Sequence, residues 1–164
     1  MGQALRALQS RRGAAVLTLL ALAVAAIDQG VKAAVAARIP LGASLPVLPD
    51  VFYLTHVTNP GVAFGLFQQA GGIRAFASAL TAILLLLYTR DRWRHSPLSR
   101  LGLAVMLGGA AGNLIDRLRF GHVIDYLDFR VWPVFNLADV AIVVGGGCLF
   151  YTLIFRTRGR QPDA

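Results

Sequence analysis

Long apolar runs alternate with shorter polar segments along this chain. Four of the runs have about the length and composition of helices that cross a bilayer, since ~20 apolar residues at ~1.5 Å per residue span its hydrocarbon core of ~30 Å. They lie at about residues 14–37, 73–88, 98–117 and 137–155. The pattern therefore predicts an all-α membrane protein with four transmembrane helices, in a single integral membrane domain over 1–164.

The first run also fits the apolar core of a secretory signal peptide. A short basic segment precedes it, and Ala23 and Ala25 supply the small residues of a cleavage site. The helical pattern nevertheless continues through Asp28 and Lys32 to about Ala37, and further membrane-length runs follow. We therefore expect a first transmembrane helix that is retained.

Two segments between the runs, 38–71 and 118–135, have a different character. The first contains prolines that interrupt helix, and its stretch 51–57 is rich in the β-branched and aromatic residues of a strand. An Asn-Pro-Gly turn at 59–61 leads into 62–67, which could return beside that strand. Because an open sheet edge cannot be satisfied in lipid, we predict a small extracytoplasmic β-cradle.

Composition agrees with a membrane protein and argues against other classes. With 56% hydrophobic residues and a mean hydropathy of +0.61, the chain is too apolar for a soluble domain of 164 residues. A net charge of +8 would suggest nucleic acid as the partner of a soluble protein. Here the arginines lie beside the apolar runs, which favours an anionic membrane surface and no nucleic acid. The single cysteine, Cys148, excludes an internal disulfide and a cysteine-rich metal site.

The placement of the arginines predicts the orientation. Arginine clusters precede the first run, separate the second from the third, and follow the fourth: Arg6, Arg11, Arg12, Arg90, Arg92, Arg94, Arg156, Arg158 and Arg160. Four spans place these segments on one side of the membrane, and the positive-inside rule makes that side the cytoplasm. Both termini are therefore expected in the cytoplasm, with 38–71 and 118–135 outside.

The candidate chemistry begins where the third run ends. Helical spacing places small and polar residues of this run on one face: Gly109, Gly112, Asn113 and Asp116. The glycines, with Gly108, should let another backbone approach closely. A carboxylate is costly in lipid, so Asp116 should face the bundle interior. We interpret Asp116 as a supporting residue that pairs with a neighbouring cation such as Arg117.

Two further aspartates each have a functional and a structural interpretation. If 122–131 is extended, alternation leaves Asp125 as the charge on an apolar face and places Asp128 on the other face, as an ordinary solvated charge. Asp139 follows Asn136 by three residues, which fits a helix N-cap with an acid in the first turn. A helix that enters a membrane nevertheless needs a reason for a carboxylate, so both interpretations stay open.

Together, Asp125 and Asp139 suggest a pair that shares a proton. Two nearby carboxylates cannot both ionise cheaply, so one holds a proton near neutral pH. The ionised one can activate water while the protonated one polarises a carbonyl, which is the chemistry of aspartic proteases. Ser78 and Lys32 could pair as nucleophile and base, but no pattern brings them together.

This sequence offers few residues that could form a metal site. The chain has no glutamate and no H-E-x-x-H motif, and its histidines fall in loops expected on opposite sides of the membrane. No metal site is therefore expected. A small transporter or channel subunit with proton-relaying aspartates is the rival class, but it leaves the two structured outer segments unexplained. A structural membrane scaffold leaves the paired aspartates unexplained.

Five short motifs follow one another along the chain. They are Asp28-Gln29-x-x-Lys32, Asn59-Pro60-Gly61-Val62-Ala63-Phe64, Gly112-Asn113-x-x-Asp116-Arg117, Val123-Ile124-Asp125-Tyr126 and Phe135-Asn136-x-Ala138-Asp139. In this order and spacing they resemble the bacterial lipoprotein signal peptidases, also called type II signal peptidases. The resemblance covers about residues 15–155. The chain departs from the usual pattern at Pro60, where the family has a small polar residue, and at Tyr126, where it has phenylalanine.

This resemblance implies an aspartic endopeptidase of the bacterial inner membrane, which cleaves prolipoproteins on the amino side of a cysteine that already carries diacylglycerol. It implies that Asp125 and Asp139 form the catalytic dyad, at the outer face of the membrane. It also implies that four polar residues line the site: Asn59, Asn113, Arg117 and Asn136. Asp28, Lys32 and Asp116 then have structural roles. We expect diacylated prolipoproteins and membrane lipids as partners, a monomer, and no cofactor.

Overall fold

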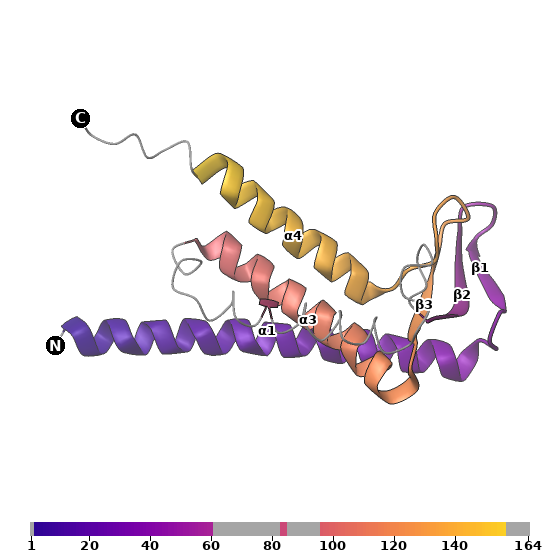
Figure 1. Ribbon diagram of the computed structural model, residues 1–164, viewed down its shortest axis with the longest axis horizontal. Helices are drawn as coiled ribbons and strands as arrows, with labels where there is room; N and C mark the ends of the chain where they lie inside the picture. The colour runs from indigo at the N-terminus through magenta and orange to yellow at the C-terminus, as the bar shows by residue number, and fades with distance from the viewer. Residues whose placement is uncertain (1, 61–82, 85–95, 157–164) are drawn as a thin grey trace.

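The computed structural model describes residues 2–60, 83–84 and 96–156. Within these residues the chain forms three long helices and one small sheet (Figure 1). The elements, in chain order, are α1 (Gly2–Arg38), β1 (Ser44–Leu48), β2 (Phe52–Asn59), α3 (Pro97–Phe120), β3 (Val123–Asp128) and α4 (Leu137–Arg156).

Three helices among the described residues are long and apolar enough to cross a membrane. They cover Gly13–Arg38, Pro97–Phe120 and Leu137–Phe155. Their bounds agree to within three residues with the first, third and fourth predicted spans. The second predicted span, 73–88, lies outside the described residues except for Ile83 and Leu84, which are helical.

Helix α3 lies between α1 and α4 and packs against both (Figure 1). Half of its apolar window is buried, 50% against 17% for each of the other two helices. The outer faces of α1 and α4 consequently present large apolar side chains, such as Leu19, Leu22 and Val143. Apolar side chains on an exposed helix face suit contact with lipid rather than with water.

Glycines on α3 allow the neighbouring helices to approach it closely. A Cβ on Gly108 would lie 2.5 Å from the backbone oxygen of Ala21 in α1. A Cβ on Gly109 would run into the backbone oxygen of Ala138 in α4. The close approach predicted for these small residues is therefore confirmed, and it occurs on two sides of the same helix.

Local chemistry sets both ends of α3. The Ser96 hydroxyl accepts the N–H of Ser99 at 3.4 Å, and Pro97 occupies the first turn, where its missing N–H costs nothing. At the other end, Gly121 adopts a left-handed conformation with φ 82° and donates its N–H to the Arg117 carbonyl at 3.1 Å. This cap turns the chain directly into β3.

The sheet is antiparallel, with strand order β1-β2-β3. Strand β2 confirms the strand predicted at 51–57. The segment expected to return beside it, 62–67, lies outside the described residues, and the strands that flank β2 are β1 and β3. The sequence did not predict β1, which contains Pro46. An edge strand tolerates a residue that lacks a backbone N–H.

The sheet joins the two outer segments into one β-cradle. Strand β3 comes from 118–135 and pairs with β2 so that Val57 lies opposite Asp125 and Asn59 opposite Val123. The cradle packs against the end of the helices where α1 ends and α4 begins (Figure 1). This pairing is what carries Asp125 to the helix ends.

Replacing Gly145 of α4 by alanine should weaken the contact between α3 and α4. The added Cβ would run into the backbone oxygen of Gly102 and would lie 2.5 Å from the Met106 side chain. Overpacking of this kind costs about 1–3 kcal/mol, so we expect a lower melting temperature in detergent. Gly147→Ala is the control, because no atom of the described residues lies within 4 Å of a Cβ at that position. Equal melting temperatures for the two variants would contradict the close packing.

Candidate active site

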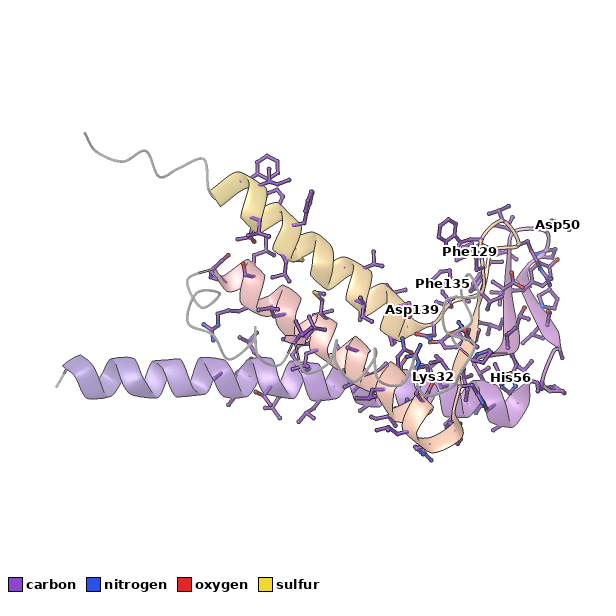
Figure 2. All side chains as sticks on the ribbon, in the orientation of Figure 1. Lys32, Asp50, His56, Phe129, Phe135 and Asp139 are labelled. Carbon is purple, nitrogen blue, oxygen red and sulfur yellow. The ribbon has the colours of Figure 1, made fainter. Side chains whose placement is uncertain are left out.

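Polar side chains from the helices and the sheet gather at the end of the bundle that carries the cradle. Figure 2 shows Lys32 of α1 and Asp139 of α4 at this end. Six of these side chains are no more than 6% exposed: Asp28, Lys32, Asn113, Asp116, Asp125 and Asn136. A buried polar group is costly without a partner, and the contacts among these residues supply the partners.

Lys32 lies at the centre of the network and is 1% exposed. Its Nζ lies 2.8 Å from Asp28 Oδ2, 2.9 Å from Asp116 Oδ2 and 2.9 Å from Asn113 Oδ1. A lysine ammonium has three N–H donors, so these three acceptors engage all of them. The charge can be buried because it is paired and fully hydrogen-bonded.

The two acids beside Lys32 have further donors on other elements. Asp28 Oδ1 accepts the N–H of Ala138 at 3.0 Å, at the start of α4. Asp116 Oδ1 accepts from Gln29 Nε2 at 2.7 Å, and its Oδ2 accepts the N–H of Ile124 at 3.2 Å, in β3. One cluster of charges on α1 and α3 therefore holds the first residues of both α4 and β3 in place.

Asp116 pairs with a cation, as predicted, but Arg117 was the wrong partner. The cation beside it is Lys32 of α1, and not the adjacent Arg117. Consecutive helical residues point about 100° apart, so Asp116 faces α1 while Arg117 faces elsewhere. Arg117 is half-buried, and its Nη1 donates to the Asn113 carbonyl at 3.3 Å. Its buried Nε has no hydrogen-bond partner among the described residues.

Two asparagines join the two candidate catalytic carboxylates. Asn136 Nδ2 donates to Asp125 Oδ1 at 2.6 Å and to Asn113 Oδ1 at 3.1 Å. Asn113 Nδ2 in turn donates to Asp139 Oδ1 at 2.8 Å. The other oxygen of Asp125, Oδ2, accepts from Asn59 Nδ2 of β2 at 2.9 Å. Asp125 and Asp139 thus belong to one continuous hydrogen-bonded chain, with three of the predicted site-lining residues as its links.

Asp139 also caps α4. Asn136 Oδ1 accepts the N–H of Asp139 at 3.0 Å, and Asp139 Oδ2 accepts the N–H of Asn136 at 3.2 Å. This reciprocal pair is a capping box, so the structural interpretation of these residues is confirmed. The cap uses one carboxylate oxygen and leaves Oδ1 to Asn113. The capping role therefore fixes the carboxylate in place and is compatible with a role in chemistry.

Burial changes the proton affinity of Asp125, which is 2% exposed. Loss of solvation raises the pKa of Asp125 from 3.8 to about 6, although hydrogen bonds from Asn59 and Asn136 favour the ionised form. The negative charge of Asp139 contributes to the increase. A carboxyl group that titrates near neutral pH is suited to proton transfer.

Asp128 lies on the other face of β3, as alternation predicts, but it is not a solvated charge. It is 5% exposed, and its Oδ2 accepts from the Thr55 hydroxyl at 2.7 Å. Arg130 adds an N–H bond to Oδ1 at 2.8 Å and an ion pair with Oδ2 at 3.5 Å. The Thr55 hydrogen bond and the charge of Arg130 lower the pKa of Asp128. The neighbouring strand β2 covers this side chain, which the pattern of β3 alone does not reveal.

An apolar groove of about 500 Å³ opens beside Asp139. Its walls are the loop before α4 and the first turns of α4: Phe129, Val131, Trp132, Phe135, Asp139, Val140, Val143 and Val144. Asp139 is the charged member of this lining. Neighbouring helices fill the space beside Gly108 and Gly109, and the groove lies where the aromatic residues of the loop meet α4.

The sequence did not predict the roles of two further residues of the site, Gln29 and Tyr126. Gln29 Nε2 donates to Asp116 and, at 3.1 Å, to the Gly112 carbonyl. Its position between two charged residues inside an apolar run was the available signal. The hydroxyl of Tyr126, where the family usually has phenylalanine, accepts the N–H of Leu137 at 3.3 Å and so supports the start of α4.

The described part of the chain gives little support to a metal site or to a serine–lysine pair. There, no three His, Cys or carboxylate side chains are grouped so as to hold a metal ion. His56 Nδ1 lies 2.8 Å from the Ile39 carbonyl. Ser78 lies outside the described residues, while Lys32 has its three donors engaged as above.

Residues 20–155 match the protein family described as signal peptidase II. The chain belongs to the signal peptidase II family. The lipoprotein signal peptidase of Moorella thermoacetica is 50% identical over 88% of this chain and 97% of its own length. That of Pelotomaculum thermopropionicum is 45% identical over 84% of this chain and 91% of its own length.

Two solved structures have the same fold, and both are of bacterial membrane enzymes obtained by the in meso method. The one at 2.3 Å resolution has a TM-score of 0.80 at 24% identity, over 92% of this chain and 94% of that one. The one at 1.9 Å has a TM-score of 0.75 at 26% identity, over 86% of this chain and 94% of that one. The arrangement of helices and cradle is therefore that of a known membrane enzyme fold.

Loss of the Lys32 charge should strongly destabilise this signal peptidase II protein. Lys32→Met leaves Asp28 and Asp116 without the cation that pairs with both. Breaking a buried ion pair on one side costs about 3–5 kcal/mol, which should show as a much lower melting temperature in detergent. The double variant Asp28→Asn/Lys32→Met removes one charge of each sign and should recover much of the loss. An unchanged melting temperature for Lys32→Met would contradict the central role of this contact.

Proposed function

We propose that this protein is an aspartic endopeptidase that removes the signal peptide from diacylglyceryl-modified prolipoproteins, on the amino side of the lipidated cysteine. One observation carries the proposal: Asp125 and Asp139 are linked through Asn136 and Asn113 by hydrogen bonds of 2.6 to 3.1 Å. The names of the curated relatives, lipoprotein signal peptidases, support the substrate class.

The two carboxyl groups have different surroundings, which suggests different roles. Asp125 is buried, and its pKa, raised to about 6, suits it to hold the shared proton. Asp139 is half-buried and borders the groove, so its carboxylate can meet water and substrate. Asp139 takes a proton from the attacking water while Asp125 gives its proton to the oxygen of the scissile carbonyl. The tetrahedral intermediate then collapses: Asp139 gives its proton to the leaving nitrogen as the C–N bond breaks, and Asp125 takes back the hydroxyl proton as the new carboxyl group forms.

The groove supports a lipid-bearing substrate. Its lining is apolar apart from Asp139, and it lies where α4 begins, at the cradle end of the helices. Acyl chains held there would bring the scissile bond next to the dyad, which lowers the entropic cost of reaching the transition state. The charge of Arg117 interacts with those of Asp139 and Asp125, and its guanidinium can donate to a carbonyl of the bound peptide. With Asn59, Asn113 and Asn136 it forms the substrate-binding part of the site.

We also propose a topology for the whole chain. It crosses the bacterial inner membrane four times as a single domain, with both termini in the cytoplasm and the cradle and dyad at the outer face. The arginine clusters support this orientation through the positive-inside rule. We propose that it acts as a monomer, because the hydrogen bonds that join Asp125 to Asp139 need no residue from a second copy.

Asp125→Asn and Asp139→Asn should each abolish cleavage of a diacylated prolipoprotein by the purified protein in detergent. Asparagine keeps the shape of the side chain but cannot exchange the proton, and loss of an essential acid or base costs at least about 10²–10⁴-fold in rate. Asp128→Asn is the matched control, because Asp128 faces away from the dyad toward Thr55. We expect it to cleave at close to the parent rate, with a somewhat lower melting temperature.

Comparison at equal amounts of folded protein, without added metal, separates chemistry from folding. The same precursor without diacylglycerol should be cleaved far more slowly, because the groove would then hold no acyl chains. A folded Asp139→Asn variant that works at the parent rate would show that Asp139 only caps α4. Equal rates for the two precursors would remove lipid recognition from the proposal.

The topology can be tested by labelling single cysteines in a Cys148→Ser background. Asp50, on the exposed turn between β1 and β2, is labelled at the far edge of the cradle in Figure 2. Asp50→Cys should react with a membrane-impermeant thiol reagent in intact spheroplasts. Pro97→Cys, at the exposed start of α3, should react only after the membrane is opened. Reaction of both variants in intact spheroplasts would rule out the proposed orientation.

A further inference from the structure

Lys32 does not touch the dyad, yet one hydrogen-bond link joins it to Asp139. Its Nζ donates to Asn113 Oδ1 at 2.9 Å, and the Nδ2 of the same amide donates to Asp139 Oδ1 at 2.8 Å. Figure 2 shows Lys32 and Asp139 on different helices at the same end of the bundle. A charge on α1 is thereby connected through a single side chain of α3 to the carboxylate on α4.

The chemistry of the three groups permits one orientation of the Asn113 amide. An ammonium group can only donate hydrogen bonds, and an ionised carboxylate can only accept them. The reverse orientation would place the amide NH₂ against Lys32 and the amide oxygen against Asp139. Asn136 Nδ2 also donates to Asn113 Oδ1, at 3.1 Å, and so favours the same orientation.

We propose that Lys32 is a positioning residue for the peptidase reaction: by holding Asn113 Oδ1, it keeps the Asn113 NH₂ on Asp139 Oδ1 and so aims that carboxylate at the groove. The inference rests on the proposed aspartic mechanism. It goes beyond support of the fold, because a residue that only paired Asp28 with Asp116 would have no effect on the reaction rate of folded protein.

The contacts of the two acids separate these roles. Without Lys32, Asp28 would keep the N–H of Ala138, and Asp116 would keep Gln29 and the N–H of Ile124. Asn113 Oδ1 would keep a single donor, from Asn136. The amide is therefore the partner whose orientation depends most on the ammonium.

Lys32 also influences the charge balance of the dyad. The titratable groups that surround Asp125 and Asp139 come from all the packed elements: Asp28 and Lys32 of α1, Asp116 and Arg117 of α3, and Tyr126 of β3, while β2 contributes the neutral Asn59. Burial raises the pKa of Asp125, and the charge of Lys32 opposes that increase. Removal of Lys32 makes ionised Asp125 less favourable. The alkaline limb of the pH–rate profile, which reports loss of the proton from Asp125, should then move to higher pH.

The test compares Asp28→Asn/Lys32→Met with Asp28→Asn alone, as full-length protein in detergent acting on a diacylated prolipoprotein. The single variant loses a supporting charge but keeps Lys32 on Asn113. In the double variant we expect kcat to be at least about tenfold lower than in the single variant, the factor typical of one hydrogen bond to a charged group. We expect KM to change by less than about twofold and the alkaline limb of the pH–rate profile to move to higher pH. Equal kcat and equal pH profiles per folded enzyme would overturn the proposal.

Asn113→Asp provides a second test if the double variant folds poorly. It is isosteric and keeps an oxygen toward Lys32, but it replaces the donor to Asp139 with an acceptor. We expect a loss of kcat of at least about tenfold, and parent kcat with the parent pH profile would overturn the inference. Asp139→Asn, measured in parallel, separates the two hypotheses. If Asp139→Asn cleaves the substrate, the aspartic mechanism is overturned. If Asp139→Asn is inactive while Asp28→Asn/Lys32→Met keeps the kcat of Asp28→Asn, only the positioning role is overturned.

Discussion

A lysine ammonium with three acceptors around it holds the polar end of this helix bundle together. Lys32 is 1% exposed and bonds Asp28, Asp116 and Asn113 at 2.8 to 2.9 Å. Such a cluster contributes little net stability over an apolar core, but the loss of Lys32 leaves two buried carboxylates without their cation. What the cluster provides is a fixed arrangement, because its acids also bind backbone N–H groups at the starts of α4 and β3.

That arrangement determines where the two candidate catalytic carboxylates lie. Asp139 is in the first turn of α4, three residues after Asn136. The residue before it, Ala138, donates its N–H to Asp28, which fixes the backbone at this point. Asp125 follows Ile124, whose N–H bonds Asp116. The burial that makes the cluster necessary also removes water from Asp125 and raises its pKa to about 6. Burial therefore accounts both for the need for the supporting contacts and for the raised pKa of Asp125.

The local patterns in the sequence predicted local features well. Helix ends at Arg38 and Leu137 follow from hydrophobic periodicity, the capping box from Asn136 and Asp139, and the opposite faces of Asp125 and Asp128 from strand alternation. Contacts between distant segments could not be read in this way. The pairing of Asp116 with Lys32 joins residues of two helices, and the burial of Asp128 depends on Thr55 of the next strand. The groove depends on how the loop before α4 folds over that helix, which no single pattern encodes.

The most direct test is the structure of a complex with a peptide that carries an S-diacylglyceryl cysteine and a non-cleavable hydroxyl group in place of the scissile carbonyl. The hydroxyl group mimics the tetrahedral intermediate. It should lie within hydrogen-bond distance of both Asp125 and Asp139, with acyl chains in the groove lined by Phe135 and Val143. A hydroxyl group bound away from one or both aspartates, with the Asn113 bond to Asp139 unchanged, would contradict a reaction performed jointly by the two carboxylates.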